Sequence, residues 1–329
     1  MEPYLPNYLK GKNRRLVFDL LRERGQMSRA EITRDTGMSF PTAMKVVDAF
    51  LEKGLLVELD ETGPAAGAGR KGRLLRFEPG AYRAVGVECE GRFARVGLAD
   101  MAGGVQARET IELGDFARTR DLSPLAAAIR RMCAAANGAP VLGVCIGFPA
   151  NLDPDAAAIV SYAAMDIQQP TSFAQVFPAF WREVELPVYL ENDANLACEG
   201  EAFLRRGAGG AANMLYLSIG SGCGGAVRLD GKLRRGARCR AGEVGAMLLQ
   251  PALGAPGRSA ARETLEDAVC LAALERRFGA ALRDGAQPGE ASAQAMRDYL
   301  CGPLSGAVYS LVMTLDVELC VLAGIVPGA

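Results

Sequence analysis

Two short helices joined by a tight turn are predicted near the start of the chain, and they constrain its fold more than any other feature. The segment Ser28-Arg-Ala-Glu31 has the pattern of a capping box, in which the hydroxyl and the carboxylate each bind a backbone N–H at the start of a helix. Gly37 permits the sharp turn that ends this helix, Ser39 can cap the next helix, and Pro41 is tolerated in its first turn. This spacing predicts a helix-turn-helix unit, although a generic three-helix bundle with a solvated face fits the same spacing.

The segments around this unit favour a winged helix over a bundle. A first helix is predicted over residues 12–25, with an apolar stripe of Leu16, Val17, Leu20 and Leu21. The third helix is predicted over residues 39–53, and its inward face is expected to hold Met44, Val47, Phe50 and Leu51. Strands predicted at 55–58 and 74–77 flank a glycine-rich loop, which is the strand–loop–strand arrangement of a wing.

Six polar or basic residues of this region are candidate DNA contacts. The N-terminal residues of a recognition helix enter the major groove, and arginines flanked by glycines fit the negative minor groove of A·T-rich DNA. The candidates are Ser39, Thr42 and Lys45 on the third helix, and Arg70, Lys71 and Arg73 in the loop. For the loop, a solvated basic segment without DNA contacts is the alternative.

The charge distribution divides the chain into two parts. Residues 1–80 carry 14 Lys and Arg against 11 Asp and Glu, whereas the rest carries 23 against 27. The junction at residues 61–73 is rich in Gly, Pro and Ala, as in a flexible loop. We therefore expect a DNA-binding domain over residues 1–80 and a second domain over residues 81–329.

The chain contains no histidine, which excludes Ser-His-Asp triads, histidine acid–base catalysis and imidazole metal sites. Its nine cysteines form no Cys-x-x-Cys pair, and most lie in apolar runs, so we expect small buried side chains in a reducing cytoplasm. The N-terminus does not have the pattern of a signal peptide, and no apolar run is long enough to span a membrane. A cytoplasmic protein without a membrane partner is expected.

The larger part alternates strands and helices, which predicts a two-lobed α/β domain. A meander at 84–89, 95–98 and 105–112 is followed by a helix at 124–137 and a strand at 141–147. Further elements are predicted as a helix at 172–184, a strand at 186–190, a helix at 194–204 and strands at 213–219 and 226–229. The last two strands flank Gly220-Ser-Gly-Cys-Gly-Gly225, a turn whose backbone amides could approach a phosphate.

Taken in order, these motifs resemble the ROK family of repressors and sugar kinases over nearly the whole chain. Asn13-Arg14, Ser28–Glu31, Thr36–Ser39 and Gly69-Arg70 are similar to the winged-helix head of its repressors. Glu191-Asn-Asp-Ala-Asn195 resembles its sugar-site motif, and Gly220–Gly245, ending in Ala-Gly-Glu-Val-Gly, resembles its signature. The resemblance implies an actin/hexokinase-like fold for the second domain.

The resemblance also implies roles for four residues. Asn192 and Asp193 match the pair that binds sugar hydroxyls, and in the family's kinases this aspartate is the general base. Glu243 and Glu266 match carboxylates that hold the sugar from the other side. Without the resemblance, Asn192-Asp193 would be read as a turn with an Asx cap at the end of a strand.

Several departures from the family pattern argue against kinase chemistry. The family's zinc-binding histidine falls at Ala246, and residues 254–264 contain none of its zinc-binding cysteines, so we expect no zinc. The first phosphate loop of the kinases matches Glu88-Cys-Glu-Gly-Arg92, where Glu90 would repel a phosphate and Glu88 and Arg92 replace the usual Asp and Thr. We therefore expect neither ATP nor Mg²⁺ as a cofactor.

Three functions remain from the sequence. The first is a cytoplasmic regulator of carbohydrate genes, a repressor that binds operator DNA as a homodimer or higher homo-oligomer and senses a sugar or sugar derivative. The alternatives are an ATP-dependent hexose kinase that carries a DNA-binding head, with Asp193 catalytic, and a DNA-binding protein that binds no ligand. Residues 322–329 resemble the strand and glycine turn before the family's last helices, so we expect either a truncated C-terminus or a small lobe that is closed differently.

Overall fold

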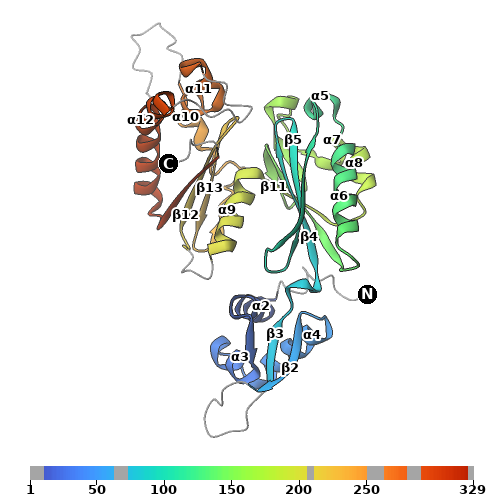
Figure 1. Ribbon diagram of the computed structural model, residues 1–329. Coiled ribbons are helices and arrows are strands. Elements are labelled where there is room, and N and C mark those ends of the chain that lie inside the picture. Colours follow the sequence, from blue (N-terminus) through green and yellow to red (C-terminus); the bar gives the residue numbers. More distant parts are fainter. Residues whose placement is uncertain (1–10, 63–72, 206–210, 250–262, 280–289, 325–329) are drawn as a thin grey trace.

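The computed structural model describes residues 11–62, 73–205, 211–249, 263–279 and 290–324. A small head lies beside two α/β lobes (Figure 1). The head comprises the described residues up to Ala81, the first lobe runs from Arg83 to Asn192, and the second lobe comprises the described residues from Asp193 onward. The domain boundary expected after residue 80 falls in the short turn Pro79–Ala81 and stays a prediction.

The head contains three helices and a three-stranded antiparallel sheet. Its elements are α2 (Lys12–Arg24), β1 (Gln26–Ser28), α3 (Arg29–Thr36), α4 (Phe40–Glu52), β2 (Leu56–Thr62) and β3 (Arg73–Phe77). The strands are ordered β1-β3-β2. The three predicted helices and the two predicted strands are confirmed, whereas β1 was not predicted because three residues are too few to show a period.

The head core differs from prediction at one residue of α2. Leu16 is 43% exposed, and Phe18, which was not assigned to the apolar stripe, is 7% exposed. The ring of Phe18 packs edge-to-face against Phe50 and Phe77, at centroid distances of 6.5 and 5.6 Å. The larger aromatic side chain buries more apolar area than leucine, so α2 is turned to bury it.

The first lobe is built on a five-stranded mixed sheet ordered β11-β7-β4-β5-β6. Its strands are β4 (Arg83–Glu90), β5 (Phe93–Asp100), β6 (Val105–Glu112), β7 (Val141–Phe148) and β11 (Val188–Asn192). Strands β4, β7 and β11 are mutually parallel, so their carboxyl ends reach the same edge of the sheet. A small sheet beside them contains β8 (Asn151–Asp153), β9 (Ala158–Ser161) and β10 (Thr171–Ser172).

Helices α5 (Phe116–Thr119), α6 (Ser123–Ala135), α7 (Phe173–Val176) and α8 (Pro178–Glu183) complete this lobe. The single helix predicted over residues 172–184 is wrong, because Phe177 separates α7 from α8 with φ −124° and ψ 65°. A residue before proline avoids the helical conformation, and Pro178 then occupies the first position of α8. The Phe177 ring fills the lobe core instead, 4.8 Å from Phe173 and 5.9 Å from Phe148.

The second lobe has a four-stranded sheet ordered β14-β13-β12-β15, with helices on both faces (Figure 1). Its strands are β12 (Met214–Ile219), β13 (Cys223–Leu229), β14 (Lys232–Leu233) and β15 (Leu319–Gly324). Its helices are α9 (Asp193–Arg205), α10 (Leu265–Val269), α11 (Leu271–Phe278) and α12 (Glu290–Leu315). Helix α9 packs on one face through Cys198 and Ala202, and α10–α12 cover the other face.

All nine cysteines are free thiols, and most are buried or half-buried as expected, although Cys301 is exposed. Within the described ranges, no helix is long and apolar enough to cross a membrane.

Candidate functional site

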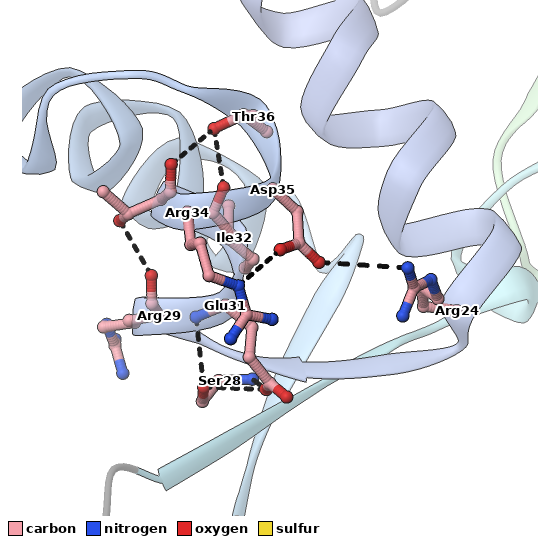
Figure 2. A network of polar contacts seen from close by, with 9 residues as sticks. Arg24, Ser28, Arg29, Glu31, Ile32, Arg34, Asp35 and Thr36 are labelled. Atoms are coloured by element: carbon pink, nitrogen blue, oxygen red, sulfur yellow. Dashed lines mark hydrogen bonds and ion pairs between the residues drawn. The ribbon is translucent and has the colours of Figure 1, made fainter. Parts of the chain in front are cut away.

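Helix α3 of the head begins at the predicted capping box (Figure 2). The backbone N–H of Ser28 donates to Glu31 Oε2 at 2.8 Å, and the N–H of Glu31 donates to Ser28 Oγ at 3.3 Å. The Ser28 hydroxyl also donates to Glu31 Oε2 at 2.8 Å, and the hydrogen bonds that the Ser28 N–H and hydroxyl donate hold the pKa of Glu31 below its usual value. Gly37 ends the helix in the left-handed conformation, with φ 66°. Both ends of α3 are therefore formed as predicted, by the capping box at its start and by Gly37 at its end.

Ion pairs tie α3 to its neighbours in the head. The Asp35 carboxylate lies 2.7 Å from Arg34 Nε and 3.9 Å from the Arg24 guanidinium of α2 (Figure 2). On the other side of α3, Arg29 pairs with Glu58 of β2, which also lies 3.5 Å from Arg73. These ion pairs connect α3 to α2 on one side and to the strands on the other.

The tip of α4 brings together the three predicted helix contacts. Ser39 occupies the N-cap position, but its hydroxyl lies 2.8 Å from the Thr42 hydroxyl and makes no capping bond, so the predicted side-chain cap is wrong. Ser39 and Lys45 are exposed, and Thr42 is half-buried. The first turn of α4 contains no acidic residue, so the N-terminal end of the helix dipole keeps its positive potential. Sequence reasoning missed Phe40, which is 56% exposed at this tip.

A shallow groove joins this tip to the beginning of α2. Its lining includes Lys12, Asn13 and Arg14 from α2, and Thr42 and Lys45 from α4. Arg73 begins β3, and its side chain is 61% exposed. The Glu58 carboxylate forms an ion pair with it and partly offsets its positive charge. Arg70 and Lys71 lie outside the described residues.

A second site lies between the two lobes, in a cleft of about 660 Å³. All four predicted sugar contacts line this cleft: Asn192, Asp193, Glu243 and Glu266. Asn192 ends β11 and Asp193 begins α9. Glu243 directly precedes the short helix Val244–Ala246, and Glu266 lies on α10. The fold therefore brings together residues that are more than 70 positions apart in the sequence.

Asp193 is the first residue of α9 and is half-buried at the cleft. Burial is the main reason that the pKa of its carboxyl is raised to about 6, and the negative charges of Glu88 and Glu90 contribute to the same shift. The backbone N–H of Ala194, which donates to Asp193 Oδ1 at 2.9 Å, acts in the opposite direction. The carboxyl is thus close to a change of charge near neutral pH.

Asn192 caps α9 as well as lining the cleft. Its Oδ1 accepts the N–H of Asn195 at 3.1 Å, and its Nδ2 donates to the carbonyl of Ala150 at 3.3 Å. The Asx cap, which was the alternative interpretation of this motif without the family resemblance, is therefore present. The same two hydrogen bonds fix the orientation of the Asn192 side chain.

Glu191 and Arg235 support this motif. Sequence reasoning named Glu191 as part of the motif without giving it a role, and it missed Arg235. Glu191 is 7% exposed, and its Oε1 accepts Nδ2 of Asn195 and the N–H of Asn192, each at 3.0 Å. Its Oε2 accepts Nε of Arg235 at 2.8 Å. A buried carboxylate needs such partners, but nothing in the sequence places Arg235 next to a strand 44 residues away.

Glu243 and Glu266 lie on the second-lobe side of the open cleft. Glu266 Oε2 accepts the N–H of Cys223 at 2.9 Å, which ties α10 to the start of β13. Partial desolvation in the cleft raises the pKa of Glu243, and the charges of Asp193 and Glu266 add to this effect. Asn151, also missed, donates to Glu243 Oε1 at 2.6 Å when its amide nitrogen is turned toward that carboxylate.

The end of β4, where the sequence resemblance led us to expect the first phosphate loop, is acidic but partly neutralised. One guanidinium, that of Arg95, lies 2.9 Å from both the Glu88 and the Glu90 carboxylates. The repulsion expected from Glu90 is therefore reduced, and one net negative charge remains. Arg92 does not offset it, because it pairs with Glu112 at 3.1 Å.

The described lining of the cleft contains six carboxylates and neither lysine nor arginine. These carboxylates belong to Glu88, Glu90, Asp166, Asp193, Glu243 and Glu266. Glu90 also faces the glycine turn, because a Cβ on Gly220 would lie 3.6 Å from its Oε1. The cleft can thus offer many hydrogen-bond acceptors, but it repels an anionic group.

The described ranges contain no group of three or more Cys, Asp or Glu side chains that could hold a metal ion. Ala246, where the sequence resemblance led us to expect the family's zinc-binding histidine, lies in the short helix Val244–Ala246. Residues 254–262 lie outside the described part of the chain.

Comparison with known proteins gives one family. The family model described as "ROK family" matches residues 84–328. A xylose repressor from Caldicellulosiruptor bescii is 27% identical over 241 residues, covering 72% of this chain and 58% of the relative. A glucokinase from Halalkalibacterium halodurans is 34% identical over 141 residues, covering 41% of this chain and 40% of the relative. The chain thus spans about three-fifths or less of the length of these relatives.

Solved structures agree with this fold. The crystal structure of a ROK family transcriptional regulator, described as a homologue of the E. coli MLC protein, has a TM-score of 0.74 and 18% identity. It covers 95% of this chain and 83% of its own, so the likeness must include most of the head. A ROK hexokinase from Thermus thermophilus has a TM-score of 0.55 and 25% identity, and covers 74% of this chain and 82% of its own.

Proposed function

The chain belongs to the ROK family, and we propose that it is a sugar-responsive transcriptional repressor of carbohydrate genes. In this proposal the head binds operator DNA through α4 and the adjoining wing, and the cleft between the lobes binds a neutral sugar or sugar derivative. Relatives named xylose repressor support this role. A homodimer is proposed because two half-sites give useful specificity.

One observation carries the proposal: a helix-turn-helix head with a cationic groove is joined to a cleft lined by carboxylates. A polyanion is attracted to the first surface and repelled by the second. Carboxylate and amide groups can grip vicinal hydroxyls, as Asn192, Asp193, Glu243 and Glu266 are proposed to do. No metal and no nucleotide are needed for this activity.

Helix α9 gives the two sites a physical connection. Its first residue, Asp193, lines the cleft, and near its far end the Phe203 ring lies 4.1 Å from the Arg22 guanidinium of α2. On the first lobe, Met101 and Leu142 pack against the head core. The head therefore contacts both lobes, and a sugar that binds one lobe arrangement better than another would change how the head is held.

Sugar kinase activity is the second candidate, because kinases are among the relatives and Asp193 fits a general base. A carboxyl with a pKa of about 6 can accept a proton near neutral pH. The carboxylates of Glu88 and Glu90 oppose this candidate, since they lie where phosphoryl transfer needs cations. A DNA-binding protein that binds no sugar is the third candidate.

A thermal-shift panel separates these candidates. The purified chain is heated with neutral hexoses and pentoses, each with and without Mg·ATP, and phosphorylated product is measured in parallel. We expect one sugar to raise the Tm without ATP and no phosphorylated sugar to form. Phosphorylation of any sugar would support the kinase, and no shift with any sugar would support the third candidate.

A further inference from the structure

Phe40, the first residue of α4, is an aromatic side chain that does not belong to the core of the head among the described residues. It is 56% exposed, although an aromatic residue usually contributes most by being buried. The aromatic centre of the head is formed by Phe18, Phe50 and Phe77 without it. The inward face of α4 is also filled, by Ala43, Val46, Val47 and Phe50.

The surroundings of Phe40 make its ring an apolar spot within a polar and cationic surface. The hydroxyls of Ser39 and Thr42 are bonded to each other, and Pro41 is exposed and lacks an N–H. The exposed Lys45 lies one turn further along the helix. No acidic residue occurs in the first turn, so nothing there repels a nucleic-acid backbone.

The chemistry of DNA indicates what such a spot can recognise. The first residues of a recognition helix meet base edges in the major groove, where the 5-methyl group of thymine is the apolar feature. We infer that Phe40 is a specificity-determining residue that recognises thymine by contact of its ring with this methyl group. This inference rests on the proposed DNA-binding function and adds a base preference to it.

The test uses thymine and deoxyuracil, which differ only by the methyl group. Duplexes are selected from a random-sequence pool with the purified full-length chain, and each thymine of the enriched half-site is replaced singly by deoxyuridine. Affinity is measured by fluorescence anisotropy at one fixed salt concentration. For the unaltered protein we expect one or two positions at which removal of the methyl weakens binding about fourfold, the effect of burying one such group.

Three variants identify the side chain responsible. Phe40→Ala should bind the thymine and deoxyuridine duplexes equally at those positions, whereas Phe40→Leu should keep most of the difference. Tyr309→Ala is the matched control, because Tyr309 is also an exposed aromatic residue, at 68%, but lies on α12 of the second lobe. Tyr309→Ala should show the same difference in affinity between thymine and deoxyuridine duplexes as the unaltered protein. Equal Tm values would show that all variants are folded.

Failure of the role of Phe40 and failure of DNA binding itself give different results in this experiment. If the pool yields no enriched sequence, DNA recognition itself fails, and the inference fails with it. If a sequence is enriched but contains no methyl-sensitive thymine, the role of Phe40 is overturned and DNA binding stands. The same conclusion follows if Phe40→Ala remains as methyl-sensitive as the unaltered protein.

Discussion

The head and the cleft between the lobes differ in the sign of the charge that they present. The tip of α4 has no acidic residue, and Lys12, Arg14 and Lys45 line the groove beside it. The described lining of the cleft contains six carboxylates and no cation. One chain thus carries a surface suited to a polyanion and a cavity suited to an uncharged polyol, which the net charge of −1 conceals.

The largest expected effect comes from removing a core ring in one region only. Phe50→Ala and Phe148→Ala each delete a fully buried ring, which costs about 3–5 kcal/mol of unfolding free energy. We expect Phe50→Ala to abolish DNA binding and spare the sugar-induced thermal shift, and Phe148→Ala to do the reverse. If either variant loses both activities equally, the two regions do not act as separate sites.

The next effect concerns the cleft. Asp193→Asn removes a charged acceptor, so we expect a loss of about 1.5–3 kcal/mol of sugar-binding free energy. Isothermal titration calorimetry measures it, with Glu112→Gln as a control because Glu112 is an exposed carboxylate outside the cleft. An unchanged affinity in Asp193→Asn would remove Asp193 from the site.

The same residue gives a pH dependence of stability. The pKa of Asp193 is raised from 3.8 to about 6 on folding, so the folded state binds more protons between these values. This carboxyl therefore destabilises the protein increasingly as the pH rises through that window, and by an amount on the order of 3 kcal/mol above it. Asp193→Asn should raise the Tm more at pH 7.5 than at pH 4.5, and an equal change at both would contradict the raised pKa.

A smaller effect is expected in the wing. Arg70→Ala and Arg73→Ala should each weaken operator binding at fixed salt and lower the slope of log affinity against log salt by about 1. The loss at Arg73 should be the smaller of the two, because Glu58 already lies 3.5 Å from its guanidinium. Unchanged affinity and slope in both variants would leave the loop as a solvated basic segment.

The smallest effect concerns the contact between the two regions. Phe203→Ala removes a cation–π contact worth about 0.5–1 kcal/mol. We expect DNA affinity without sugar, and sugar affinity without DNA, to stay within twofold, while the effect of sugar on DNA affinity falls two- to fivefold. A full response to sugar in this variant would show that coupling does not pass through α9.

Local patterns predicted much of this structure. What was missed was either a local signal that a stronger one outweighed or a contact that strand pairing and folding create. The capping box at Ser28 and the turn at Gly37 depend on neighbouring residues, so their spacing was sufficient. The break at Phe177 was missed because apolar periodicity outweighed the effect of the following proline. Arg95 and Arg235 could not be placed beside their carboxylates, because strand pairing and folding bring them there.

The most direct test measures operator affinity with and without sugar. The full-length chain is titrated onto its selected duplex by fluorescence anisotropy at fixed salt, with each sugar that raises its Tm and with no ATP present. We expect one neutral sugar to change the affinity at least about fivefold, the lower end of typical coupling energies. Operator affinity that stays the same at saturating concentrations of every such sugar would contradict a sugar-responsive regulator.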